Sequence, residues 1–236
     1  MKAIILAAGR GSRMKSLTQD RPKCLIKVRG KTLLDWQIEA LQEAGLSEIS
    51  IVTGYKRELI SNRGLTEFHN PHWAKTQMVT SLSYAEAWLQ QGPCVVSYSD
   101  IFYSYEAPKS LMFCQARLAL TYDPNWRKLW TMRFGDPLKD AETFRLKHAK
   151  KLEEIGNSPR SVEEIEGQYM GLLLFTPEGW DEVVRVRSDL TSQQRDKMHM
   201  TGTLQEIIKA GRIEIEALPY EGEWGEVDSE EDLSHY

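Results

Sequence analysis

Hydrophobic residues recur along the chain in two patterns, one typical of strands and one typical of helices. Short apolar or alternating runs predict strands that are at least half buried. They cover residues 3–8, 48–53, 94–98, 118–122, 170–175 and 213–218. Other apolar residues recur at the three- and four-residue spacing of a helix, over residues 32–44, 78–90 and 204–210. Strands and helices that alternate in this way are typical of βαβ units, so the pattern predicts an α/β fold with a mixed, mostly parallel sheet.

Residues 123–168 interrupt the alternation. This stretch is more polar and contains three prolines and several charge clusters. We expect it to form a less regular excursion over one edge of the sheet. Repeats, low-complexity tracts and linker-like segments are not evident, and 236 residues suffice for an ample core. The sequence therefore predicts one domain over residues 1–236.

The composition and net charge of the chain limit the kinds of ligand that it is expected to bind. Hydrophobic residues make up 41% and charged residues 27% of the chain, and the net charge is −4. These values argue against a nucleic-acid-binding footprint but leave small anionic ligands open. Three widely spaced cysteines, the lack of a signal-like start and the lack of a bilayer-length apolar run suggest a reduced, cytoplasmic protein with no membrane partner. We expect Cys24 to be a packing thiol rather than a nucleophile.

A glycine-rich turn follows the first strand. It reads Gly9-Arg10-Gly11-Ser12-Arg13, and Pro22-Lys23 comes ten residues later. Small side chains let backbone amides approach phosphate oxygens, while Arg13 offers a planar fork and Lys23 a mobile point charge. Neither the Walker pattern nor the dinucleotide fingerprint matches this segment. A tight strand-to-helix turn also explains a glycine pair, so the two cations carry the argument for phosphate binding.

The run Leu6-Ala7-Ala8-Gly9-x-Gly11-Ser12-Arg13, with Lys23 in Pro22-Lys23, resembles the nucleotidyltransferases that make activated sugars and alcohols. The resemblance implies a single Rossmann-like nucleotidyltransferase domain. It also implies a nucleotide site at the first strand and turn, with Arg13 and Lys23 as catalytic residues. The nucleotide-binding residues implied here are Leu6, Ala8, Gly9, Gly11, Ser12 and Arg13.

Spacing also distinguishes branches of this family. The ten-residue interval between Arg13 and Lys23, with Leu17-Thr18 inside it, favours the branch that acts on sugar 1-phosphates and phosphocholine. Enzymes of terpenoid precursors and molybdopterin dinucleotides place the lysine closer to the arginine. Ser16 departs from the proline that is common in the favoured branch.

Two acidic segments match the family's metal-binding positions. Asp100 follows the strand at residues 94–98, and Asp228 lies in Glu226-Val227-Asp228 near the C-terminus. The resemblance implies that both aspartates hold one metal ion. Carboxylates brought together at strand ends also form, on chemical grounds alone, a hard oxygen site suited to Mg²⁺. Taken alone, Asp228 fits a solvated acidic face better than a metal site, but the two aspartates together with the N-terminal turn favour the metal site.

The segment Lys75-Thr76-Gln77-Met78-Val79-Thr80-Ser81-Leu82 resembles the base-recognition segment of cytidylyltransferases for phosphocholine, aminoethylphosphonate and related phosphorylated alcohols or amides. The resemblance implies that Gln77 and Ser81 contact the nucleotide, although Gln77 replaces the usual asparagine. Helix capping by these two side chains stays open as an alternative.

Further residues resemble the acceptor side of the same branch. They are Trp126, Arg133, Gln168 and Tyr169. Trp126, Trp130 and Tyr169 would suit a cationic head group through cation–π contact, whereas core packing is the alternative for these aromatic rings.

The implied reaction is Mg²⁺-dependent transfer of a nucleotidyl group from CTP to a small phosphorylated alcohol, amino-alcohol, phosphonate or amide, with release of pyrophosphate. The product would serve surface polysaccharide or lipid decoration. A uridylyl- or thymidylyltransferase for a sugar 1-phosphate and a non-catalytic nucleotide-binding regulatory domain stay open as alternatives. The oligomeric state is also open, a homodimer included.

Overall fold

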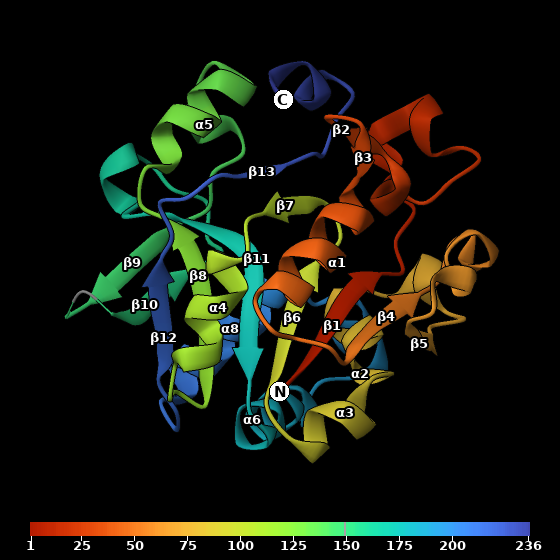
Figure 1. Cartoon of the computed structure of the whole chain (residues 1–236). Helices are drawn as coiled ribbons and strands as arrows, with labels where there is room; N and C mark the ends of the chain where they lie inside the picture. The colour runs from red at the N-terminus through yellow and green to blue at the C-terminus, as the bar shows by residue number, and fades with distance from the viewer. Residues whose placement is uncertain (149) are drawn as a thin grey trace.

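A computed structural model describes residues 1–148 and 150–236 of the chain, and its centre is a nine-stranded sheet (Figure 1). The strand order is β5-β4-β1-β6-β11-β8-β12-β10-β9, and every strand except β11 and β10 runs in the same direction. The strands are β1 (Lys2–Ala7), β4 (Ile49–Thr53), β5 (Thr66–His69), β6 (Cys94–Tyr98), β8 (Leu118–Asp123), β9 (Phe144–Lys147), β10 (Lys151–Ile155), β11 (Gln168–Phe175) and β12 (Ile215–Pro219). The predicted mixed, mostly parallel sheet is confirmed.

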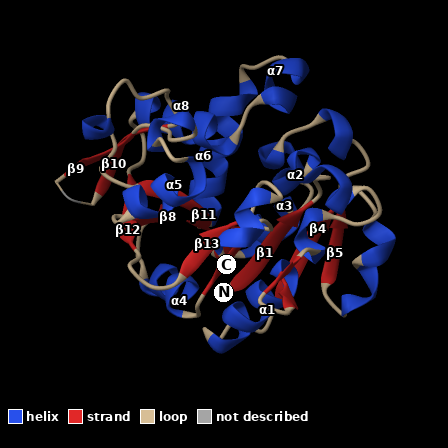
Figure 2. Ribbon diagram, turned by 90° about the horizontal axis from the view of Figure 1, so that it is seen from above, coloured by secondary structure: helices blue, strands red, loops and turns tan. Residues whose placement is uncertain are grey.

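Helices lie on both faces of this sheet (Figure 2). They are α1 (Leu33–Glu43), α2 (Met78–Ser83), α3 (Glu86–Gln91), α4 (Glu106–Phe113), α5 (Trp126–Phe134), α6 (Pro177–Ser188), α7 (Ser192–Lys197) and α8 (Met200–Ala210). In Figure 2, α1 and α4 lie on one side of the strands, while α3, α6 and α8 lie on the other. The central strands are therefore covered on both faces, which explains why they read as nearly continuous apolar runs.

Shorter elements complete the chain. Two small ribbons pair β2 (Lys27–Val28) with β3 (Lys31–Thr32) and β7 (Ile101–Tyr103) with β13 (Trp224–Glu226). The 3₁₀ turns are η1 (Ser12–Thr18), η2 (Lys23–Leu25), η3 (Arg57–Leu59), η4 (Ser61–Arg63), η5 (Trp73–Lys75), η6 (Pro137–Lys139), η7 (Val162–Glu164) and η8 (Glu231–His235). Within the described residues, the helices are all too short or too polar to cross a membrane.

Local sequence signals explain the main helix boundaries. Thr32 caps α1 by accepting a hydrogen bond from the Asp35 amide, and Thr176 caps α6 in the same way. The helix predicted over residues 78–90 is instead two helices, because Ala85 leaves the helical conformation (φ −95°, ψ 14°) between α2 and α3. The helix predicted over residues 204–210 begins earlier, at Met200.

The segment at residues 123–168 contributes both a helix and an extension of the sheet. Helix α5 comes first, and β9 and β10 then form an antiparallel hairpin at the sheet edge beyond β12. Neither element was predicted from the sequence, because their apolar runs are short and contain several charged residues.

The order of the strands places a crevice at the end of β1. From β1 the chain proceeds to β4 on one side, and β6 pairs with β1 on the other side. The connections thus diverge at the carboxyl ends of β1 and β6, which is where open α/β sheets bind ligands. The glycine-rich turn leaves β1 at this point, and Asp100 follows β6 there.

Candidate active site

The glycine-rich turn packs directly against Lys23. Gly11 has a φ of +76°, and a Cβ at this position would lie 2.8 Å from the Cβ of Lys23. The turn is closed from the far side by Thr18, whose hydroxyl donates a hydrogen bond to the Gly11 carbonyl at 3.0 Å. A residue with a side chain would be strained at this φ and would collide with Lys23. Glycine at position 11 therefore allows the lysine stem to pack against the turn.

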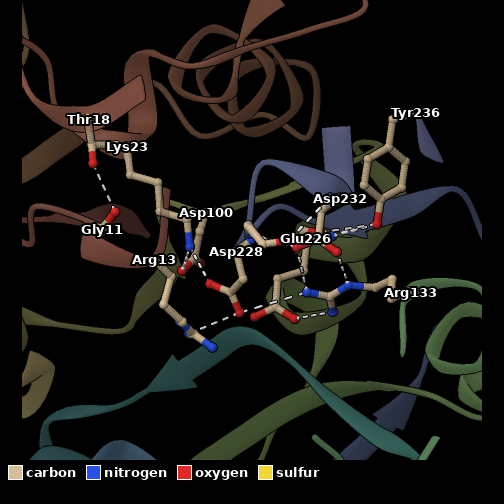
Figure 3. Close-up of polar contacts among 11 residues, drawn as sticks. Gly11, Arg13, Thr18, Lys23, Asp100, Arg133, Glu226, Asp228, Asp232 and Tyr236 are labelled. Carbon is tan, nitrogen blue, oxygen red and sulfur yellow. Dashed lines mark hydrogen bonds and ion pairs between the residues drawn. The ribbon is translucent and has the colours of Figure 1, made fainter. Parts of the chain in front are cut away.

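Backbone pairing brings two distant aspartates together. Strand β7 begins directly after Asp100, and β13 ends two residues before Asp228. These strands pair antiparallel, with Ile101 opposite Glu226, and the Val227 amide donates a hydrogen bond to the Asp100 carbonyl at 2.9 Å. The carboxylates of Asp100 and Asp228 consequently face the same point in front of β1 (Figure 3).

Two cations from the N-terminal segment meet these carboxylates (Figure 3). The Lys23 Nζ atom lies 2.9 Å from Asp100 Oδ2 and also donates a hydrogen bond to Asp228 Oδ1. The Arg13 guanidinium lies 3.1 Å from Asp228 Oδ2 and keeps 66% of its side chain exposed. Lys23 is therefore a buried charge between two acids, whereas Arg13 projects into open space with free donors.

Burial and neighbouring charges shift the pKa values of residues in the site. Burial acts to lower the pKa of Lys23, but the Asp100 and Asp228 carboxylates outweigh it and the pKa is raised. Burial acts to raise the pKa of Asp228, but Lys23 and Arg13 hold it below its ordinary value. Lys23 and Asp228 are therefore both charged near neutral pH. Glu226 differs, because burial and the neighbouring Asp228 charge raise its pKa to about 8.

The carboxylates have the composition of a divalent-cation site. Asp100, Glu226 and Asp228 each offer one oxygen, and the three oxygens lie within 4.8 Å of one another. Asp100 Oδ1 is buried and has no hydrogen-bond partner among the residues that the structure describes. An unpaired buried acceptor within a set of hard oxygen ligands fits Mg²⁺.

Behind these carboxylates, Arg133 binds the C-terminal segment to α5. Its side chain is fully buried and donates to Asp232 Oδ1 at 2.8 Å and to Glu226 Oε2 at 2.7 Å. The Asp232 carboxylate in turn accepts hydrogen bonds from the amides of Asp228 and Ser229, both at 2.8 Å. Arg133 therefore holds the turn that carries Asp228.

Asp232 was not predicted as a functional residue, although the sequence contains a signal for it. Ser229 and Asp232 exchange side-chain-to-amide hydrogen bonds, since the Asp232 amide donates to Ser229 Oγ at 3.3 Å and the Ser229 amide donates to Asp232. This reciprocal pattern resembles a capping box, which a serine followed three residues later by an acid can suggest.

Two cavities meet at this cluster. The smaller has a volume of about 300 Å³, and it is lined by all the residues predicted to bind the nucleotide. These are Leu6, Ala8, Gly9, Gly11, Ser12, Arg13, Gln77 and Ser81. Lys23, Asp100 and Asp228 line the same cavity.

The larger cavity has a volume of about 530 Å³ and lies on the side of β11 and β10. Both cavities share four lining residues, which are Arg13, Met78, Tyr98 and Asp228. Two ligands bound in them would therefore be adjacent at Arg13 and Asp228.

Gln77 and Ser81 are not simple caps of α2. Gln77 occupies the N-cap position, but its side chain makes no capping hydrogen bond. Ser81 lies inside the helix, and its hydroxyl accepts a hydrogen bond from the Asn70 side chain at 2.9 Å. The capping alternative is thus not supported for either residue.

The residues predicted for the acceptor side divide into two groups. Gln168 and Tyr169 line the larger cavity, as does Trp130. Trp126 and Arg133 are not among its lining residues, and their role in binding the acceptor stays a prediction. Trp126 packs edge-on against Trp130 at 6.4 Å between ring centroids, and Arg133 is engaged by carboxylates, so both lie behind the cavity wall.

Comparison with known proteins identifies the family to which the chain belongs. Residues 3–123 match the family model described as the MobA-like NTP transferase domain. Because the match spans half of the chain, the protein belongs to this family and is a nucleotidyltransferase.

The chain is also similar to individual relatives that are named as cytidylyltransferases. The chain is 34% identical to the CTP:phosphoglutamine cytidylyltransferase of Campylobacter jejuni subsp. jejuni serotype O:2, over 99% of this chain and 98% of that protein. It is 35% identical to the 2-aminoethylphosphonate cytidylyltransferase of Lancefieldella rimae over 44% of each chain. The fold is similar to that of the CTP:phosphocholine cytidylyltransferase of Streptococcus pneumoniae, with a TM-score of 0.71, 21% identity, and coverage of 99% of this chain and 96% of that chain.

Replacing Arg133 tests the anchoring of Asp228. Arg133→Met leaves the carboxylates of Glu226 and Asp232 buried without their cation, so we expect the free energy of unfolding to fall by about 3–5 kcal/mol. Arg133→Lys keeps the charge but loses the fork, and an intermediate loss is expected. Urea titration followed by circular dichroism measures both values. A loss below about 1 kcal/mol for Arg133→Met would contradict the anchoring role.

Alkylation tests whether the Cys24 thiol is unreactive in the folded protein. Burial raises the pKa of its thiol to about 12, so at pH 8 the thiolate is scarce and cannot act as a nucleophile. In the folded protein we expect iodoacetamide to modify the less buried Cys114 well before Cys24, and denaturant should remove the difference. Peptide mass spectrometry of alkylated samples measures the order. Equal alkylation rates in the folded protein would show that Cys24 is reactive.

Proposed function

We propose that the protein is a Mg²⁺-dependent cytidylyltransferase that joins the CMP group of CTP to a small phosphorylated acceptor. An oxygen of the acceptor's phosphate or phosphonate attacks the α-phosphorus of CTP. The bond between that phosphorus and its bridging oxygen breaks, and pyrophosphate leaves. A phosphate oxygen is already nucleophilic near neutral pH, so the reaction needs charge neutralisation and alignment rather than a general base.

The observation that carries this proposal is the position of Lys23 in the nucleotide cavity, where its ammonium group contacts Asp228, a residue that lines both cavities. Its ammonium group lies beside Asp100 and Asp228, and Arg13 stands at the boundary of both cavities. From these positions Lys23 would bridge the α-phosphate and the incoming phosphate, and Arg13 would bind the β- and γ-phosphates. The amides of the glycine-rich turn supply further donors.

Asp100 and Asp228, with Glu226 beside them, would hold Mg²⁺, which when bound supplies positive charge at the α-phosphate. Lys23 would then bind phosphate oxygens with an ammonium group that its acidic neighbours keep protonated. The two phosphate groups repel each other in water, and this cluster of fixed charges would offset that repulsion.

CTP is favoured as the nucleotide by the relatives and by the cavity. The full-length relative from Campylobacter jejuni and the relative from Lancefieldella rimae are both named as cytidylyltransferases. Gln77 and Ser81 line the nucleotide cavity next to Leu6 and Ala8 at the end of β1. The Gln77 side chain is free of capping contacts and can hydrogen-bond to a base edge.

The larger cavity suits an acceptor that carries an ammonium group. Asp140 and Glu142 line it, and burial raises the pKa of both carboxyls, which places them in a partly desolvated wall. Trp130, Tyr169 and Tyr98 supply aromatic faces to the same cavity. Carboxylates and aromatic rings together stabilise a cation. Such a product would serve surface polysaccharide or lipid decoration from the cytoplasm, where the three free thiols stay reduced.

A pyrophosphate-release assay with Mg²⁺ tests both substrates. Four nucleoside triphosphates are paired with phosphocholine, phosphoethanolamine, 2-aminoethylphosphonate, glycerol 3-phosphate and glucose 1-phosphate. We expect CTP to be preferred, and acceptors with an ammonium group to exceed the neutral ones about tenfold in kcat/KM, the effect of about 1.4 kcal/mol. Preference for UTP or dTTP with glucose 1-phosphate would favour the alternative sugar nucleotidyltransferase.

Lys23→Met tests the phosphate-binding role. The variant removes one charge that acts in the transition state, so kcat should fall by about 10²–10³. Lys27→Met is the matched control, because Lys27 is an exposed lysine on β2 and its loss should leave kcat unchanged. Circular dichroism verifies that both variants fold. A folded Lys23→Met variant with near-normal turnover would remove Lys23 from the mechanism.

A further inference from the structure

The wall of the larger cavity includes a segment that is tied to the nucleotide side. Residues 197–202 line this cavity, and they run from the last residue of α7 into the first turn of α8. Figure 2 shows α7 at the outer margin of the molecule, away from the strands. The start of α8 packs against the end of β10, where a Cβ on Gly156 would lie 2.8 Å from the Cβ of Thr201. Helix α7 has its principal contacts with neighbouring helices instead.

The principal contacts run to α2 and to the residue before it. The Gln77 amide donates a hydrogen bond to the Asp196 carbonyl at 2.8 Å. The Thr80 hydroxyl lies 3.4 Å from the Arg195 carbonyl. Gln77 also lines the nucleotide cavity, so one short stretch of chain contacts both the nucleotide site and the α7 segment.

Arg187 joins these two parts from α6. Its side chain is buried, and its Nη2 atom donates to the Thr80 hydroxyl at 2.9 Å and to the Arg195 carbonyl at 3.0 Å. A single guanidinium nitrogen thus connects α2 with α7. Its other terminal nitrogen, Nη1, is buried and has no hydrogen-bond partner in residues 1–148 and 150–236.

The environment of Arg187 is unusual for a buried cation. Among the described residues it makes no ion pair, and both of its acceptors are neutral oxygens. A buried charge without a counter-charge lowers stability, and an apolar side chain of similar size is often more stable at such a position. Stability alone therefore does not account for an arginine between α2 and α7.

We propose that Arg187 is a positioning residue that couples nucleotide binding to the acceptor wall. The inference rests on the proposed function, because it requires a nucleotide beside Gln77 and Ser81. A nucleotide that contacts these residues restricts the motion of α2. Through Thr80, Arg187 and the carbonyl groups of Arg195 and Asp196, that restriction reaches residues 197–202. The acceptor cavity thereby gains its ordered wall when the nucleotide is bound.

Hydrogen exchange with and without Mg²⁺ and CTP tests the coupling without knowledge of the acceptor. In the wild-type protein, CTP should slow amide exchange in two stretches, residues 77–83 and residues 192–202, by about fivefold or more. In Arg187→Met the protection of residues 77–83 should persist, while the nucleotide-dependent protection of residues 192–202 should disappear. The comparison within each variant removes any general change in stability.

Three further variants sharpen the test. Arg185→Met is the matched control, because Arg185 lies on the same helix, is 62% exposed and pairs with Glu182. It should retain both effects of CTP. Arg187→Lys can reach only one of the two acceptors and should give partial protection. Thr80→Val removes the hydroxyl that Arg187 contacts, and it supplies the test if Arg187→Met does not fold.

The outcomes separate this inference from the proposed function. Full nucleotide-dependent protection of residues 192–202 in Arg187→Met, or in Thr80→Val if the former is unfolded, would overturn the inference. So would a wild-type protein in which CTP protects residues 77–83 alone. If CTP protects neither stretch and another nucleoside triphosphate does, the choice of CTP fails while the coupling can be measured with that nucleotide. If none protects residues 77–83, the proposed nucleotide site itself is wrong, and the inference fails with it.

Discussion

The site depends on the neutralisation of buried carboxylates that the backbone forces together. Pairing of β7 with β13 fixes Asp100 beside Asp228, and like charges at such short range repel strongly in a partly desolvated environment. Lys23 offsets this repulsion at the front of the site, and Arg133, whose Nη2 atom lies 3.8 Å from Asp228 Oδ2, does so at the back. The same arrangement that permits folding thus concentrates charge at the point where two phosphate groups would meet.

The two arginines near Asp228 have different roles because their surroundings differ. Arg133 has every polar contact satisfied by Glu226 and Asp232 and is removed from solvent, so it can hold the acidic turn but cannot follow a ligand. Arg13 contacts Asp228 at 3.1 Å yet keeps most of its guanidinium exposed. A planar group with free donors beside a cavity is suited to bind phosphate. Burial, rather than residue type, therefore separates the anchoring Arg133 from the exposed Arg13.

Local sequence rules predict where the glycine-rich turn and Asp100 lie in the fold. The glycine-rich turn and Asp100 follow β1 and β6, two strands with a strong apolar pattern, and parallel strands end at a common edge of the sheet. Arg133 was predicted on the acceptor side because its segment resembles that part of the family, and the docking of α5 directs its guanidinium toward the C-terminal turn. Arg187 carries no local signal at all, since its role arises only from the packing of three helices.

The two cavities differ in how far their lining follows from local sequence signals. The smaller cavity takes six of its lining residues from the end of β1 and the glycine-rich turn, and most others from the segment around α2 and the end of β6. The larger cavity draws on α5, the hairpin β9–β10, β11 and residues 197–202, which are far apart in sequence and are joined only by the fold. A phosphate chain is recognised by backbone amides and cations that recur in one turn, whereas an acceptor is recognised by the shape of several independent segments. Changes in α5 or in the α7 segment can therefore alter the acceptor while the chemistry at Lys23 is preserved.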